Sequence, residues 1–170
     1  MKSLLLSLVT VATLLLGSAI GQSPRLGVEL RTDKTSYNLK DVVSFEILLT
    51  NKSRAPIYLY SDLEWGESAS VSIWLKDAAS GKDVGYVVIP DAVTPPPTSK
   101  EDFVKVLPDH VYGLVIASSV HDLDVRKKGA YQVVAYYHSP IPQSYSFDLP
   151  IWSHEDGMLR SNTVRVTIGD

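Results

Sequence analysis

The chain has 170 residues, of which 45% are hydrophobic and 21% are charged, and its formal net charge at pH 7 is −3. It contains no cysteine, which excludes disulfides, thiolate metal sites, a thiol nucleophile and a lipid-modified cysteine. The acidic and basic residues are spread along the chain without the basic stripe that a phosphate backbone requires, so nucleic acid is not an expected partner.

The N-terminus has the pattern of a secretion signal. Lys2 precedes an apolar run at 4–16, and small residues follow at 17–21. The run is shorter than the roughly 20 residues that cross a bilayer core, and no basic cluster follows it, so we expect no membrane span after cleavage. We predict a signal peptide at 1–21 and one domain at 22–170, exported to a periplasm or to the medium. An exported domain without disulfides is typical of a bacterial envelope.

The rest of the chain is patterned as short β-strands. In three segments apolar residues alternate with polar ones, which buries one face of a strand and leaves the other in water. Five further runs are rich in valine, isoleucine and tyrosine. The segment at 102–107 fits either a strand or a short helical turn, and we prefer a strand. The predicted strands are 26–31, 43–50, 56–60, 71–75, 84–89, 102–107, 111–118, 130–138 and 163–168.

Turn-forming residues separate these runs at 51–53, 80–82, 127–129 and 156–157. This spacing is typical of a sandwich of short antiparallel strands. The predicted fold class is therefore all-β, with a single immunoglobulin-like antiparallel β-sandwich.

Two connections, at 90–100 and 139–154, are longer than ordinary turns. The first contains Pro95, Pro96 and Pro97, whose fixed φ angles and missing amide donors favour an extended polyproline conformation. Loops of this length are either functional or tolerated insertions.

Three segments resemble the immunoglobulin-like modules of bacterial secreted proteins, including macroglobulin-type domains and a proteinase-inhibitor family of similar sandwich form. Residues 33–43 resemble the family's Tyr-x-x-Gly-Glu-x-Val segment, with Lys40 and Asp41 where Gly and Glu are usual, and residues 48–57 resemble its Asn-x-Ser turn. Residues 128–133 place Tyr131 just after a glycine. The resemblance implies that Tyr131 forms a tyrosine corner, with its hydroxyl bonded to the preceding loop.

Motifs for catalysis are missing from the sequence, including a Gly-x-Ser-x-Gly elbow, a His-Glu-x-x-His helix and a phosphate-binding glycine loop. Four histidines, at 110, 121, 138 and 154, could converge on a metal, but none is paired at ligand spacing, so isolated histidines are the favoured interpretation. Asp122 and Asp124 suggest turn carboxylates more than a calcium site. We therefore predict no enzyme activity, no cofactor and no metal.

Aromatic residues are the most informative side chains for function. If Val71, Ile73 and Leu75 face the core, alternation sends Trp74 outward, and the same rule would send Tyr58 and Tyr60 outward from their own run. Large aromatic side chains on a solvent face are typical of a binding surface. The competing interpretations are that a long loop covers this face, or that Trp74 is the core tryptophan and the register is reversed.

Three hypotheses for function follow. The first is a non-catalytic interaction module that binds a protein through a sheet edge, the aromatic face or the proline-rich loop. The second is a peptidase inhibitor that uses the loop at 90–100. The third is a carbohydrate-binding module in which Trp74, Tyr58 and Tyr60 stack on sugar rings. The expected partner is thus a protein or glycan of the envelope or medium, and the sequence does not determine the oligomeric state.

Overall fold

A computed structural model describes residues 25–63, 70–86, 95–123, 125 and 127–169. The predicted signal peptide, Trp65, Asp124 and residues 87–94 lie outside the described residues. Within the described part of the chain, no helix is long and apolar enough to cross a membrane.

The described residues form ten strands and three short 3-10 helices. Nine strands lie at predicted runs, and the three-residue β2 is the one that the sequence pattern did not reveal. The strands are β1 (Leu26–Thr32), β2 (Ser36–Asn38), β3 (Val42–Asn51), β4 (Ile57–Tyr60), β5 (Val71–Asp77), β6 (Asp83–Tyr86), β7 (Phe103–Val106), β8 (Val111–Ser119), β9 (Gly129–Tyr137) and β10 (Leu159–Gly169). The 3-10 helices are η1 (Lys100–Asp102), η2 (Gln143–Tyr145) and η3 (His154–Asp156).

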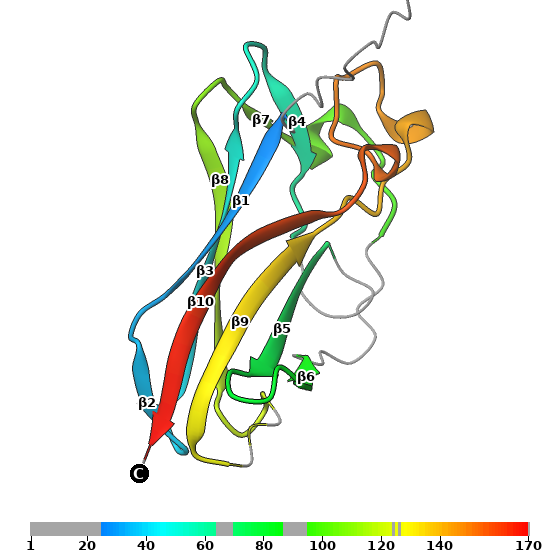
Figure 1. The fold of residues 1–170 in the computed structure, drawn as a ribbon. Helices are drawn as coiled ribbons and strands as arrows, with labels where there is room; N and C mark the ends of the chain where they lie inside the picture. The colour runs from blue at the N-terminus through cyan, green and yellow to red at the C-terminus, as the bar shows by residue number, and fades with distance from the viewer. Residues whose placement is uncertain (1–24, 64–69, 87–94, 124, 126, 170) are drawn as a thin grey trace, which may run out of the picture.

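Two sheets face each other as the layers of an immunoglobulin-like sandwich (Figure 1). One layer has the strand order β1-β3-β8, and the other has the order β2-β10-β9-β5-β6. All pairs in these layers are antiparallel except that β2 runs parallel to β10. A separate ribbon of β4 and β7 lies at one end of the sandwich, beside the connection 139–154 (Figure 1).

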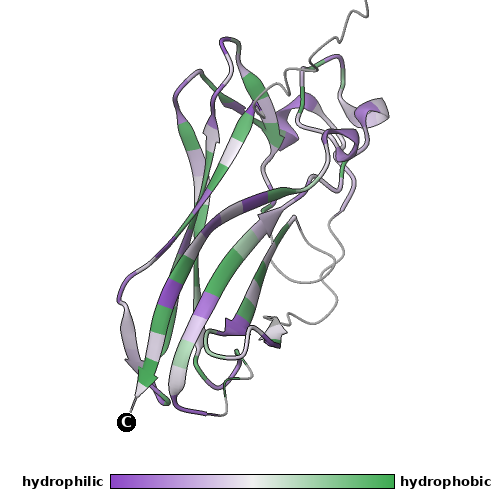
Figure 2. Ribbon diagram, in the orientation of Figure 1, coloured by the Kyte–Doolittle hydropathy of each residue, from purple (hydrophilic) through white to green (hydrophobic). Residues whose placement is uncertain are grey.

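The core contains the alternate residues that the sequence pattern predicted. Val43, Phe45, Ile47 and Leu49 of β3 are at most 1% exposed. Figure 2 shows hydrophobic and hydrophilic residues following one another along the strands. On β5, the predicted inward residues Val71, Ile73 and Leu75 are also buried. Trp74 therefore points to the outer face, and the reversed register is excluded. Among the described residues, a tryptophan that does lie in the core is Trp152, which is 4% exposed and comes from the connection 139–154.

The connection 139–154 is packed onto the β4–β7 ribbon. Ile141 and Ile151 form a second apolar cluster with Tyr60 and Phe103, and the Tyr60 and Phe103 rings meet edge to face at 5.9 Å. Tyr60 is consequently 5% exposed, so its predicted outward position is wrong. The alternation rule fails at β4 because this strand is covered on both faces, by the main core on one side and by the connection on the other.

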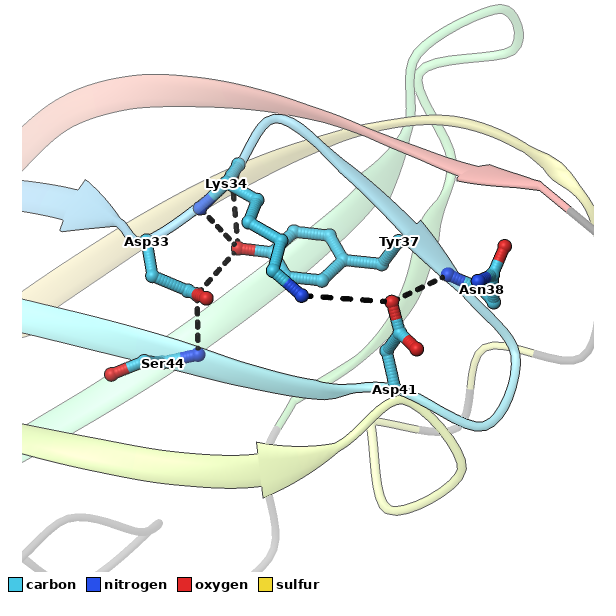
Figure 3. Close-up of polar contacts among 6 residues, drawn as sticks. All are labelled: Asp33, Lys34, Tyr37, Asn38, Asp41 and Ser44. Atoms are coloured by element: carbon cyan, nitrogen blue, oxygen red, sulfur yellow. Dashed lines mark hydrogen bonds and ion pairs between the residues drawn. The ribbon is translucent and has the colours of Figure 1, made fainter.

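The segment before β3 is fixed by the Tyr37 hydroxyl (Figure 3). Tyr37 is 2% exposed; its hydroxyl accepts a hydrogen bond from the Lys34 N–H at 3.0 Å and lies 2.8 Å from Asp33 Oδ1. Burial and the neighbouring Asp33 carboxylate raise the pKa of Tyr37. Partial burial alone would raise the pKa of Asp33, but hydrogen bonds from the Ser44 N–H and the Tyr37 hydroxyl outweigh it and hold that pKa below its ordinary value.

Two other residues of the family resemblance have defined contacts. Asp41, which stands where the family has Glu, accepts a hydrogen bond from the Asn38 N–H at 3.1 Å (Figure 3). Tyr131 is 3% exposed, and its hydroxyl donates to the Lys127 carbonyl at 2.5 Å. A hydroxyl bonded to the loop before its own strand is the arrangement of a tyrosine corner.

Candidate functional site

The three aromatic residues of the predicted binding face lie in three different places. Trp74 is on the outer face of the five-stranded layer. Tyr58 lines a depression on the β4–β7 ribbon, and Tyr60 is buried in the second cluster. A face composed of all three residues is therefore not formed, because β4 does not belong to the same sheet as β5.

Trp74 lines a groove of about 380 Å³ across β5, β6 and β9. Its indole Nε1 donates to Ser72 Oγ at 3.1 Å, and its ring meets that of Tyr136 edge to face, with the centroids 6.5 Å apart. An ion pair between Lys76 and Asp83, 3.1 Å long, lies along the same groove. The groove thus combines an aromatic pair with polar and charged side chains.

His138 adds a titratable group to this groove. Burial, together with a smaller effect of the nearby His154, lowers the pKa of His138 below 6.5. The imidazole is therefore mainly neutral at pH 7, with one nitrogen able to donate and the other able to accept a hydrogen bond.

The proline-rich segment is anchored where the structure describes it. Pro95 and Pro96 are exposed, whereas Pro97 is buried. The Tyr60 hydroxyl donates to the Pro95 carbonyl at 2.9 Å, and Asp102 Oδ2 accepts the backbone N–H groups of residues 98 and 99 at 2.6 and 3.0 Å. These bonds lower the pKa of Asp102. The described part of this segment is tied to the body of the domain, and the segment's first residues, 90–94, lie outside the described residues.

The outer edge of β8 is a further surface, which the sequence alone did not reveal. β8 ends its layer in the order β1-β3-β8. Two backbone hydrogen bonds flank β8 and continue its antiparallel register with β3: the Asn51 N–H donates to the His110 carbonyl, and the Val120 N–H donates to the Asp41 carbonyl. Since residues of an antiparallel pair bond their neighbour alternately, the even-numbered residues of β8 bond β3 and the odd-numbered ones point away.

Among the described residues, the outward N–H and C=O groups of Gly113, Val115 and Ala117 have no hydrogen-bond partner. A groove of about 460 Å³ runs along this edge, lined by residues 112–117 and by residues 61–63. The Tyr112 hydroxyl closes one end by donating to the Ser61 carbonyl at 2.9 Å. Within the described part of the chain, the edge therefore presents a row of unpaired backbone groups beside this groove.

The histidines and turn carboxylates do not assemble into a metal site in the described residues, where no group of three or more His, Asp or Glu side chains is placed to hold an ion. His121 has a side chain 94% exposed, and the carboxylate of Asp122 is 3.8 Å from its ring. Asp122 instead accepts a hydrogen bond from the Ser119 hydroxyl at 2.6 Å at the end of β8, which is the role of a turn carboxylate.

The fold and its surfaces define the class of protein: an all-β, immunoglobulin-like sandwich. No family model matches this chain, and no curated protein matches its sequence. The CARDB domain of the PF1109 protein from Pyrococcus furiosus, solved in complex with di-metal ions, is similar over 87% of this chain and 90% of that chain, with 11% identity and a TM-score of 0.39.

Two β-glucosidases are similar to the same extent. EmGH1 from Erythrobacter marinus matches 85% of this chain with 12% identity and a TM-score of 0.39. The enzyme from Listeria innocua, in complex with glucose, matches 85% with 13% identity and a TM-score of 0.37. This chain spans 15% and 16% of the two enzymes. TM-scores of this size carry no argument about function, which has to come from the surfaces of this chain.

Proposed function

We propose that this chain is a non-catalytic binding module that accepts an extended segment of a protein partner as an added strand on β8. The observation that carries the proposal is the row of open backbone groups at Gly113, Val115 and Ala117 beside the edge groove. Backbone hydrogen bonds supply affinity in strand addition, and pockets for alternate side chains supply specificity.

The composition of β8 supports this use of its edge. Val111–Ser119 contains no charged residue and no proline, and the Val111 and Val115 side chains are 52% and 66% exposed. Proteins ordinarily protect such edges with lysine, proline, bulges or a covering segment, because an open apolar edge pairs with other chains. Val111–Ser119 has no lysine, no proline and no register shift against β3.

The opposite edge of the same layer is protected. A register shift in β10 between Arg160 and Thr163 directs the Asn162 side chain at β1, where its Oδ1 accepts the Leu30 N–H at 2.8 Å and its Nδ2 donates to the Leu30 C=O at 3.0 Å. A side-chain amide thus occupies the position of a neighbouring strand. The same domain closes the edge of β1 and leaves that of β8 open, which favours a role for β8 in binding.

The groove also restricts the partner. Asp62 lies in its lining with Leu63 and Tyr112, and burial and the Asp62 carboxylate raise the pKa of Tyr112. Negative charge at this end disfavours an acidic residue of the incoming segment. The preferred partner is an extended segment that is uncharged or basic and carries small apolar residues.

The free protein already provides a test by hydrogen exchange. We expect the amides of Gly113, Val115 and Ala117 to exchange quickly and those of Leu114 and Ile116, which bond β3, to exchange slowly, by NMR of the full chain. Equal protection of both sets in the free monomer would mean that the edge is covered, and the proposal would fail.

Two substitutions at one position test binding itself. Val115→Pro removes an outward N–H without removing a bond to β3, because edge strands tolerate proline where the N–H faces solvent. Val115→Ala removes the side chain and keeps the N–H. The proteins are used to capture partners from envelope and secreted fractions. Strand addition is supported if the wild type and Val115→Ala retain a partner that Val115→Pro loses, and if the Val115 amide becomes protected from exchange in the complex. Equal retention by all three proteins contradicts it.

A glycan is the second candidate ligand, and the groove at Trp74 favours it because aromatic rings stack on sugars while Ser72, Asp83 and His138 supply hydrogen-bonding groups. The test is retention on insoluble polysaccharide. Trp74→Ala should abolish retention while the far-ultraviolet circular dichroism stays unchanged. Retention that survives the substitution excludes this groove.

Export is also proposed, on the pattern of residues 1–21. The protein purified from a periplasmic extract or from the medium should begin near Gln22, as measured by N-terminal sequencing or intact mass. A chain that keeps Met1 and stays with the cytoplasmic fraction would contradict cleavage.

A further inference from the structure

We propose that the depression around Tyr58 binds an acidic saccharide, with the carboxylate of a uronic acid held by Arg54 and Lys105. The depression has a volume of about 440 Å³, within the ordinary range of ligand pockets. It is independent of the β8 edge and of the Trp74 groove, which have different linings.

Charge is concentrated at this depression. Its lining contains Arg25, Arg54 and Lys105 and no carboxylate, although the whole chain has a formal charge of −3. Arg25 is paired with Asp156 at 2.9 Å and lies over the Trp152 ring, so it is oriented and partly neutralised. Among the ion pairs of the described residues, none involves Arg54 or Lys105. Two cations therefore remain available to a ligand.

The backbone fixes where these two cations stand. Lys105 is the register partner of Tyr58 in the antiparallel β4–β7 pair, and directly opposed residues place their side chains on the same face of a ribbon. Arg54 lies in a turn that is closed by two hydrogen bonds to the Ala55 carbonyl, from Asn51 Nδ2 at 2.8 Å and from Ser53 Oγ at 2.7 Å. Arg54 and Lys105 thus extend from hydrogen-bonded backbone into the lining that they share with Tyr58, which reduces the entropy lost on binding.

The walls of the depression select the kind of anion. Pro56, Pro150 and Tyr58 are among the residues that line it, and their side chains are largely apolar. A free phosphate or sulfate ion uses only the charges, whereas a hexuronic acid sets the C–H face of its ring against an aromatic or proline surface while its carboxylate meets a guanidinium. An acidic sugar therefore uses both features of the site. An acidic peptide side chain has no ring face to place there.

The experiment is titration of the full exported chain, at low salt, with an oligogalacturonate, with a neutral galactose oligomer of the same length and with inorganic phosphate. We expect binding of the acidic oligomer, much weaker binding of the neutral one, and affinity that falls as salt is raised. Arg54→Gln and Lys105→Gln should each weaken binding about tenfold, as expected for loss of one charge-assisted hydrogen bond. Tyr58→Leu should weaken binding of the acidic oligomer and leave binding of phosphate unchanged.

Lys40→Gln is the matched control, because Lys40 is an exposed lysine in the turn between β2 and β3, at the other end of the sandwich (Figure 1). It should bind like the wild type. An equal loss of affinity for the acidic oligomer in Lys40→Gln and Lys105→Gln would show a general effect of charge and would overturn the proposed site. Equal binding of the neutral oligomer, phosphate that competes as well as the sugar, or no binding of the acidic oligomer would each overturn the proposal. None of these results depends on Val115, so failure here is distinguishable from failure of strand addition.

Discussion

Removing the Asn51 side chain should destabilise the protein more than its position at a predicted turn suggests. Asn51 is fully buried. Its Nδ2 donates to the carbonyls of Ala55 and Val106, both at 2.8 Å. Its Oδ1 accepts from the Ser53 N–H at 2.9 Å and lies 2.7 Å from the Ser53 hydroxyl oxygen. The one amide thus joins the end of β3, the following turn and β7.

Asn51→Ala leaves these partners without their bonds and opens a small cavity. Each buried hydrogen bond contributes about 1 kcal/mol, and an orphaned buried group costs about 1–3 kcal/mol. Because Ala55 C=O keeps its bond from Ser53 and part of the turn can be hydrated, we expect a loss of about 2–4 kcal/mol in the free energy of unfolding. The measurement is urea unfolding followed by tryptophan fluorescence. Asn38→Ala, an exposed asparagine on β2, is the control and should change stability by less than about 0.5 kcal/mol.

Asn51→Asp tests the hydrogen-bond reasoning separately from the cavity. It keeps the shape but sets a carboxylate oxygen against two carbonyls, so we expect at least the loss of Asn51→Ala at pH 7. Protonation relieves this repulsion, and the folded state then binds a proton more tightly than the unfolded state, so stability should rise as pH falls. An Asn51→Ala protein within about 0.5 kcal/mol of the wild type, or an Asn51→Asp protein as stable as the wild type at pH 7, would refute the reasoning.

Three further predictions concern single polar groups. Tyr131→Phe removes the hydroxyl bond to the preceding loop and should cost about 1 kcal/mol in urea unfolding; an unchanged midpoint would contradict this role. Asp33 has a pKa held below its ordinary value of 3.8, so its bond to Tyr37 stabilises the fold above that pH, and this stabilisation is lost as pH falls through the depressed pKa of the folded state. Asp33→Asn should therefore reduce the fall in the free energy of unfolding at acid pH. The same acid dependence in the variant and the wild type would contradict this role of Asp33. The pKa of His138, measured by NMR, should lie below 6.5, and His154→Gln should raise it. An unchanged pKa of His138 in that variant would contradict the contribution of His154.

Strand positions could be predicted because each depends on a local pattern. The alternation in β3, with Phe45 and Ile47 buried, and the outward position of Trp74 on β5 follow from the two-residue period of a strand. β2 was missed because three residues contain too little pattern, and its parallel pairing with β10 is specified by residues more than a hundred positions away. Tyr60 was misplaced for the same reason: its cover comes from 139–154, which the sequence does not mark as packed.

The functional surfaces were harder to predict than the strands. Trp74 could be assigned to an outer face from its neighbours alone, but its groove requires Tyr136 and His138 from β9 and the residue after it. The cations around Tyr58 come from the residue before β1, from the turn after β3 and from β7, and no sequence motif relates them. A signal for the β8 edge does exist, since Val111–Ser119 lacks charge and proline, but an inner strand has the same composition, and only the strand order shows that β8 is an edge.

The contrast between the two edges of the β1-β3-β8 layer argues that the open edge is not a defect of a small sheet. On β1, the bulge in β10 places Asn162 so that its amide forms both hydrogen bonds of Leu30. A similar polar side chain, or one lysine among the outward residues of β8, would protect that edge at little cost to stability, because these positions are exposed. Val115→Lys is therefore expected to leave the free energy of unfolding within about 0.5 kcal/mol of the wild type while it abolishes partner capture. Loss of capture without loss of stability would separate the binding role of this edge from any role in folding, whereas capture that persists in the Val115→Lys variant would show that the partner is bound elsewhere.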